Sequence, residues 1–114
     1  MPKPELEFFP VSNTPWRPVQ GSKCEGLDER VLAANGPVAT RILRFAPGTD
    51  TTPNGEQAHE FFEVVYILSG FLTDLRPGQT FSTGMYACRP PGMLHGPWTS
   101  EEGCEIFEVR YVAT

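Results

Sequence analysis

The sequence predicts an all-β fold, a barrel or sandwich of short strands, on the strength of three observations. Gly and Pro together make up 23 of the 114 residues, and they are spread along the chain between short apolar runs. Several of these runs alternate apolar and polar residues with a period of two, as half-buried strands do. No stretch reaches about ten residues with good helix formers. Many short strands joined by turns explain all three observations.

Residues 1–26 are predicted to form an extended N-terminal arm. Proline fixes φ and removes a backbone donor, so neither a helix nor a central strand suits a segment this rich in proline. Three aromatic side chains could anchor the arm on the barrel or on a neighbouring subunit. Residues 27–114 are expected to form a single β-barrel domain. The residues of the arm behind this reading are Pro2, Pro4, Pro10, Pro15, Pro18, Phe8, Phe9 and Trp16.

The strands of the barrel follow in order. Residues 27–34 suggest a strand or a short helix, and Asn35-Gly36 is a hairpin turn signal. The run 57–68 is the most apolar of the chain, and its β-branched and aromatic residues favour a strand over a helix. We expect Ser69-Gly70 to close it. The remaining expected strands span 38–45, 71–75, 81–88 and 104–112, with a loop over 89–98.

Composition excludes several classes of partner. The net charge is −5, and the nine Lys and Arg residues form no basic run, which argues against nucleic-acid and membrane partners. No apolar stretch approaches the roughly 20 residues that span a bilayer, and the N-terminus lacks the apolar core of a signal peptide. We therefore expect a cytoplasmic protein. Three cysteines without CxxC spacing indicate neither a disulfide framework nor a zinc ribbon, and Cys88 and Cys104 are expected to be buried in strands.

The two histidines, His59 and His95, each stand at the edge of a predicted strand. His59 lies four residues before Glu63 and two residues after Gln57. On a straight strand, residues four apart are about 13 Å apart, too far for one metal ion. A tight bend at 60–62 would let Gln57 and His59 point inward from one segment and Glu63 from the next.

His95 follows a loop that Pro90, Pro91 and Gly92 preset, so its position is fixed at little entropic cost. Two imidazoles and one carboxylate suit one divalent metal and leave positions open for water, O₂ or substrate. We favour Fe(II); zinc, manganese and nickel are the alternatives. Gln57 offers a carbonyl oxygen as an optional fourth ligand, or as a group that binds substrate.

These two segments resemble the two sequence motifs of the cupins. The resemblance covers about residues 38–112 and implies a double-stranded β-helix, or jelly-roll barrel, with a metal on His59, Glu63 and His95. Three departures stand out: Gln57 replaces the first motif histidine, Gly48 is displaced from the opening position, and Thr99 replaces an asparagine. The matching positions are His59, Glu63 and Gly70 in the first motif and Gly84, Pro90, Gly92 and His95 in the second.

Within the cupins, residues 41–48, 90–98 and 100–104 are similar to the ChrR-like group, which includes the cupin domain of the ChrR anti-sigma factor and acetylacetone-dioxygenase-like proteins. The resemblance implies a dioxygenase-type oxidoreductase for a small diketone, enol or phenolic ketone. The alternatives are a redox-neutral isomerase, cyclase or lyase and a non-enzymatic ligand-binding sensor. A homodimer is expected. The residues expected to line the substrate pocket are Gln57, Phe61, Tyr66, Met85, Met93, Trp98 and Arg41.

Overall fold

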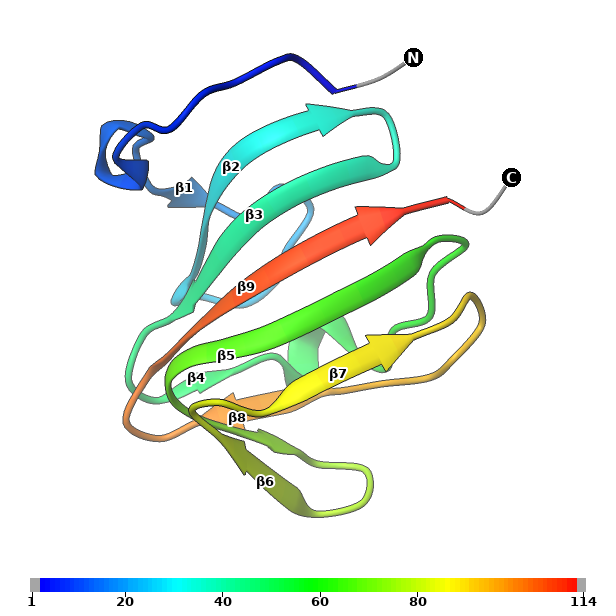
Figure 1. Cartoon of the computed structure of the whole chain (residues 1–114). Coiled ribbons are helices and arrows are strands. Elements are labelled where there is room, and N and C mark those ends of the chain that lie inside the picture. Colours follow the sequence, from blue (N-terminus) through cyan, green and yellow to red (C-terminus); the bar gives the residue numbers. More distant parts are fainter. Residues whose placement is uncertain (1–2, 113–114) are drawn as a thin grey trace.

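The computed structural model describes residues 3–112, so Met1 and Pro2 of the predicted arm and Ala113 and Thr114 of the predicted domain lie outside it. The described chain is almost entirely strand and turn, which confirms the all-β prediction (Figure 1). Residues 27–34, which the sequence left between strand and helix, lie in a strand. The elements are η1 (Val11–Asn13), β1 (Arg17–Pro18), β2 (Leu27–Asn35), β3 (Val38–Phe45), β4 (Thr49–Asp50), η2 (Thr52–Asn54), β5 (Phe62–Asp74), β6 (Gln79–Ser82), β7 (Tyr86–Arg89), β8 (Trp98–Ser100) and β9 (Cys104–Tyr111).

Two antiparallel sheets curl around one core. The larger sheet has the order β1-β2-β3-β9-β5-β7, and the smaller one contains β6, β5, β8 and β4. β5 belongs to both sheets: its first half pairs with β9 and β7, and its second half with β6 and β8. The segments that form the barrel wall are therefore far apart in sequence, as the pairing of β3 with β9 shows.

The prediction that Ser69-Gly70 ends a strand is wrong, because β5 runs unbroken from Phe62 to Asp74. Its register against β9 shifts between Ile67 and Ser69, next to the point where the strand passes from one sheet to the other. Gly70 has a φ of 79°, and a Cβ at this position would lie 2.1 Å from the carbonyl oxygen of Gly103. The glycine permits a close backbone approach within a strand, where the sequence suggested a turn.

The core lies between the two sheets. Alternation along the strands places one side chain in the core and the next one outside, so Val65 and Ile67 are buried while Tyr66 and Leu68 are exposed. Among the cysteines, Cys104 is buried as expected, but Cys88 is exposed on β7, on the opposite face from the core. The buried core consists of Leu43, Phe45, Val65, Ile67, Leu72, Cys104 and Ile106.

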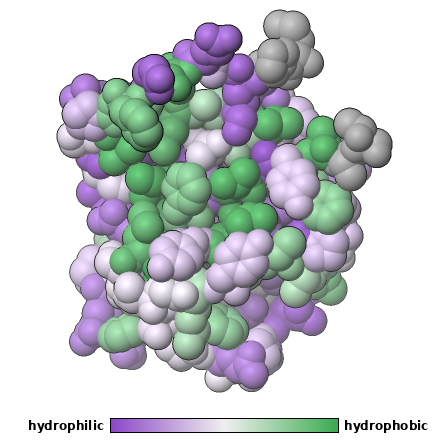
Figure 2. Space-filling view, in the orientation of Figure 1, coloured by the Kyte–Doolittle hydropathy of each residue, from purple (hydrophilic) through white to green (hydrophobic). Residues whose placement is uncertain are grey.

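The outer face of the larger sheet is also rich in apolar residues. Figure 2 shows green side chains gathered over β3, β9 and β5 on this face, with aromatic rings beside them. Tyr66, Tyr86 and Tyr111 are among its exposed residues. Exposed apolar surface of this kind is often an interaction surface, but the expected homodimer stays a prediction. No helix within residues 3–112 is long and apolar enough to cross a membrane.

The first part of the N-terminal arm lies against the outside of β2 and β3, whereas Val19, after β1, packs against the core. Trp16 is its anchor, because the guanidinium groups of Arg30 and Arg44 lie 4.3 and 4.1 Å from the centre of the indole ring. Arg17 and Pro18 then pair with β2 as a short edge strand. Phe8, expected as an anchor, is fully exposed.

Candidate metal site

Three separate segments carry the predicted ligands. His59 lies in the bend before β5, Glu63 is the second residue of β5, and His95 lies in the loop between β7 and β8. Gln57 and His95 exchange two backbone hydrogen bonds, of 2.8 and 2.9 Å, and the amide of Gly92 donates to the carbonyl oxygen of His59 at 2.9 Å. These bonds tie the two histidine segments together beside the start of β5. The bend at 60–61 lies where the sequence required one.

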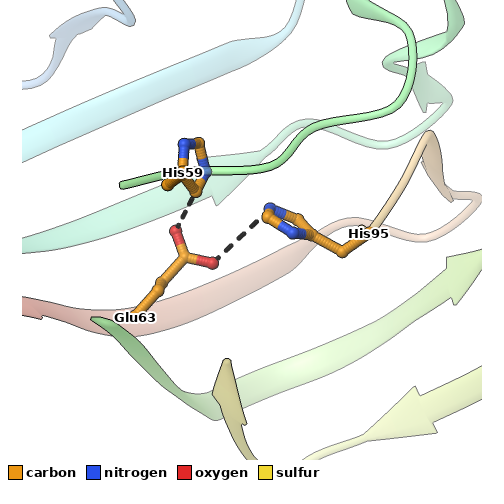
Figure 3. Close-up of side chains that lie close together, drawn as sticks. All are labelled: His59, Glu63 and His95. Atoms are coloured by element: carbon orange, nitrogen blue, oxygen red, sulfur yellow. Dashed lines mark ion pairs between the residues drawn. The ribbon is translucent and has the colours of Figure 1, made fainter. Parts of the chain in front are cut away.

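The three side chains converge (Figure 3). Glu63 Oε2 lies 3.8 Å from His59 Nε2, and Glu63 Oε1 lies 3.6 Å from His95 Nε2. One donor atom from each residue lies within 4.8 Å of the other two. A first-row metal with bonds of about 2.1 Å holds its donors about 3.0 to 3.4 Å apart, so these atoms, which lie within 4.8 Å of one another, would draw together around the ion. The residues therefore fit a divalent metal, and the donor set is the one the sequence predicted.

The two imidazoles have the charge state that a metal requires. Burial, aided by the positive charge of Arg89, lowers the pKa of His95 to about 4, and burial and Arg110 also lower the pKa of His59. His95 Nδ1 lies 3.3 Å from the carbonyl oxygen of Met93. From this contact we assign the proton to Nδ1, which leaves the lone pair of Nε2 directed at Glu63. Neutral imidazole is the form that binds metals.

Glu63 is a buried carboxyl group in a crowded electrostatic environment. Burial and the neighbouring Glu108 raise the pKa of Glu63 to about 7, although Arg89 opposes them. Arg89 Nη1 donates to Glu63 Oε1 at 2.6 Å, and Arg110 Nη2 lies 3.9 Å from Oε2. Ionised Glu63 is therefore costly in the metal-free chain, and a bound cation would favour the carboxylate form.

A buried ion-pair network, missed by the sequence prediction, lies beside the ligands. Arg41 Nε donates to Glu108 at 2.6 Å and Arg41 Nη1 donates to Glu29 at 2.7 Å. Arg110 Nε donates to Glu108 at 2.7 Å. Burial raises the pKa of Glu108, but Arg41 outweighs it and holds the value at about 2. Arg41 was expected to bind substrate, but its guanidinium donates hydrogen bonds to two carboxylates of the protein instead.

Replacing Arg41 with Met should destabilise the fold far more than replacing Arg44. Arg41→Met leaves Glu29 and Glu108 buried beside each other without their shared cation, and breaking a buried pair costs roughly 3–5 kcal/mol. Arg44 lies on the opposite face of β3 and pairs with Asp28 at the surface, at 3.3 Å, so Arg44→Met should cost about 1 kcal/mol or less. Urea unfolding of both variants measures the difference. Equal losses would contradict the role given to the buried network.

The ligands lie on the wall of a cavity inside the barrel. This inner cavity has a volume of about 470 Å³, and its wall includes all three ligands, Gln57 and Arg41. Gln57 Nε2 donates to the carbonyl oxygen of Asn54 at 2.7 Å. Its amide group is thus fixed at the cavity wall, next to the backbone pairing of Gln57 with His95. The structure thus brings Gln57 to the cavity wall beside His95.

A second, largely apolar cavity adjoins the first. This outer cavity has a volume of about 580 Å³ and shares Val65, Leu72, Arg89 and Trp98 with the inner one. Of the residues expected to line a pocket, Met85, Met93 and Trp98 line this cavity.

The other two residues expected in a pocket line neither cavity. Tyr66 is 42% exposed on the outer face of β5, because it alternates with Val65 and Ile67, which point inward. Phe61 stacks on the imidazole of His59, with ring centres 4.5 Å apart, and its other neighbour is the guanidinium of Arg110. Phe61 therefore packs against the imidazole of His59 and does not line the cavity.

Comparison with known proteins identifies the fold and the family. The model of the ChrR cupin-like domain family matches residues 6–111. An RmlC-like cupin from Shewanella frigidimarina NCIMB 400 is similar in structure, with a TM-score of 0.75 and 21% identity over 99% of this chain and 96% of that one. No curated protein matches the sequence.

Two further structures share the fold: one is of an enzyme, and the other is of an anti-sigma factor in a complex. An acetylacetone dioxygenase from Acinetobacter johnsonii has a TM-score of 0.74 and 15% identity over 94% of this chain and 74% of that one. The anti-sigma factor ChrR of Rhodobacter sphaeroides, in complex with SigE, has a TM-score of 0.63 and 19% identity over 84% of this chain and 48% of that one. At these identities, the likeness shows the fold alone. The family model spans nearly the whole chain, and the protein belongs to the ChrR cupin-like domain family.

Proposed function

We propose that this protein is a metal-dependent enzyme of the dioxygenase type, acting on a small diketone, enol or phenolic ketone. The observation that supports the proposal most is the meeting of two neutral imidazoles and one carboxylate on the wall of a cavity large enough for such a molecule. A site that only stabilised the fold would be closed, with no space beside the ligands. The fold is shared with a protein named as an acetylacetone dioxygenase.

His59, Glu63 and His95 would hold the metal. When bound, a divalent first-row metal would supply Lewis acidity and, as iron, electron exchange with O₂. The residues around it prepare the site: Trp98 and Leu72 give the cavity wall an apolar part, and the low pKa of His95 keeps its imidazole neutral. Arg89 lines the same cavity, and its positive charge would stabilise negative charge that develops on an enolate oxygen bound there.

The test begins with elemental analysis of the protein purified without a metal-affinity tag. We expect iron at nearly one equivalent per chain. The iron-loaded protein, supplied with acetylacetone in an oxygen-electrode cell, should consume one O₂ for each diketone cleaved, and the two products together should contain both oxygen atoms. The matched control is the Arg44→Gln variant, whose change lies on the outer face of β3 and should leave the rate unaltered.

Two other results would redirect the assignment. Turnover of a carbonyl substrate without O₂ consumption would point to a redox-neutral cyclase, isomerase or lyase, in which the metal would act as a Lewis acid. Tight binding of a small molecule without turnover would point to a ligand-binding module. A chain that holds no metal under any condition would contradict the proposal itself.

A further inference from the structure

The walls of the inner cavity carry more positive than negative charge, although the chain as a whole is acidic with a net charge of −5. Four cationic side chains line it, against two carboxylates: Lys23, Arg41, Arg89 and Arg110, against Glu63 and Glu108. Counting Glu29, the second partner of Arg41, the arginines and carboxylates inside the barrel are three each, so the surplus comes from the exposed Lys23 and from the exposed Arg17, which also pairs with Glu29. A divalent metal on the triad would add two further positive charges. A surplus of positive charge in a partly buried cavity favours the binding of an anion.

Arg89 is the cation best placed to receive that anion. Arg41 donates to two carboxylates. Arg89, at the end of β7, and Arg110 each donate one hydrogen bond to a carboxylate within residues 3–112, although a guanidinium has five N–H donors. Arg89 is the more buried of the two, with 11% of its side chain exposed against 24% for Arg110, and it alone of the two lines both cavities. The planar fork of its guanidinium suits a carboxylate.

The chemistry of the space beyond Arg89 describes the rest of the ligand. Arg89 and Trp98 line both cavities, with the guanidinium 5.1 Å from the indole ring centre, so they stand at the junction. From there the outer cavity is lined mostly by apolar side chains, among them Phe81, Met85 and Leu94, with Asp74, Arg76 and Gln79 also on its wall. A molecule with its charged end at Arg89 would therefore place an apolar portion against the apolar wall of the outer cavity.

We propose that the two cavities together bind a small carboxylate with an apolar body, Arg89 being the residue that binds the carboxylate and selects for it. This inference deepens the proposed function and rests on it, because it names the class of molecule that the site accepts. It also separates Arg89 from Arg41: both are arginines inside the barrel, but Arg41 donates three hydrogen bonds to two carboxylates, and Arg89 donates one to Glu63.

Binding to the zinc-loaded protein tests the inference, because zinc carries out no redox chemistry and the readout is affinity alone. The probes are 4-phenylbutyrate and its neutral amide, 4-phenylbutyramide, compared by calorimetry at pH 7.5. We expect the acid to bind at least tenfold more tightly than the amide. Acetate, which has the carboxylate without the apolar body, should bind at least tenfold more weakly than 4-phenylbutyrate. Equal affinities in either comparison would overturn the inference.

Variants then assign the preference to a residue. Arg89→Gln should lower the affinity for 4-phenylbutyrate at least tenfold and change that for the amide less than twofold; Arg89→Lys should restore part of the preference. Arg44→Gln, on the outer face of the barrel, should change neither affinity. A preference for the acid that survives in Arg89→Gln would overturn the role of Arg89.

The failure of the proposed function gives a different result. A wild-type chain that retains no zinc would contradict the metal site, and the comparison of acid with amide on that metal-free chain would still decide the inference, because the cations outnumber the carboxylates before any metal binds.

Discussion

His95→Ala will leave the chain with little or no bound metal. His95 supplies one of three converging donors, and its imidazole is already neutral and aimed at Glu63. Loss of a residue that merely supports a ligand typically costs 10- to 100-fold in metal affinity, so loss of a ligand itself should cost more than about 100-fold. Zinc titration against a competing chelator measures the affinity, and elemental analysis of the purified variant gives the retained metal.

The matched control for this experiment is Gln57→Ala. Gln57 pairs with His95 through backbone atoms, and its side chain donates to the carbonyl oxygen of Asn54. The alanine variant keeps the backbone pairing, so we expect it to retain metal with an affinity within about tenfold of the wild type. Circular dichroism on both variants establishes that they fold. Stoichiometric metal on a folded His95→Ala variant would show that the triad is not the site.

The affinity of the metal-free chain for zinc should increase about 100-fold between pH 5 and pH 7, and then level off. Burial raises the pKa of Glu63 to about 7, so a proton competes with the metal for this carboxylate throughout that range. One competing proton gives about tenfold per pH unit below the pKa. The pKa of His95, about 4, lies below the range, so His95 contributes little to the slope.

Glu63→Gln is the variant that checks this assignment. Its amide binds metal more weakly but does not titrate, so the slope that belongs to Glu63 should disappear along with most of the affinity. The measurement is the same chelator competition, calibrated at each pH. A wild-type affinity that is constant from pH 5 to pH 7 would mean that Glu63 is ionised without the metal, or that it does not bind one.

The convergence of His59, Glu63 and His95 was predictable because spacing and chemistry agreed. His59 and Glu63 needed a bend between them to reach one metal, and the structure has that bend at 60–61. His95 needed a preset loop, and its backbone pairing with Gln57 fixes that loop in place. The bend follows from local sequence, whereas the meeting of His95 with the other two residues depends on its pairing with the distant Gln57 and was implied by the resemblance to the cupin motifs.

The charged interior was harder to predict because it depends on pairing between distant strands. In β9, Glu108 and Arg110 share the face of Ile106, and a charge on an otherwise buried face was a signal of a polar interior. Buried Glu108 is stabilised by Arg41, which lies opposite it on β3. This pairing follows only from the register of β3 against β9. Gly70 misled for a related reason: its positive φ serves an approach to Gly103, which lies far away in sequence.

The metal-site residues and the wall of the outer cavity come from different segments of the chain, so one can change in evolution without the other. The metal ligands depend on the start of β5 and on the Gln57–His95 pairing. The apolar walls of the outer cavity come largely from residues 76–94, a hairpin and loops whose side chains there are mostly exposed. Substitutions in that segment can reshape the outer cavity for a new molecule while the start of β5 and the Gln57–His95 pairing stay unchanged. A lineage, or a laboratory selection, could change what this barrel accepts without rebuilding the centre that would act on it.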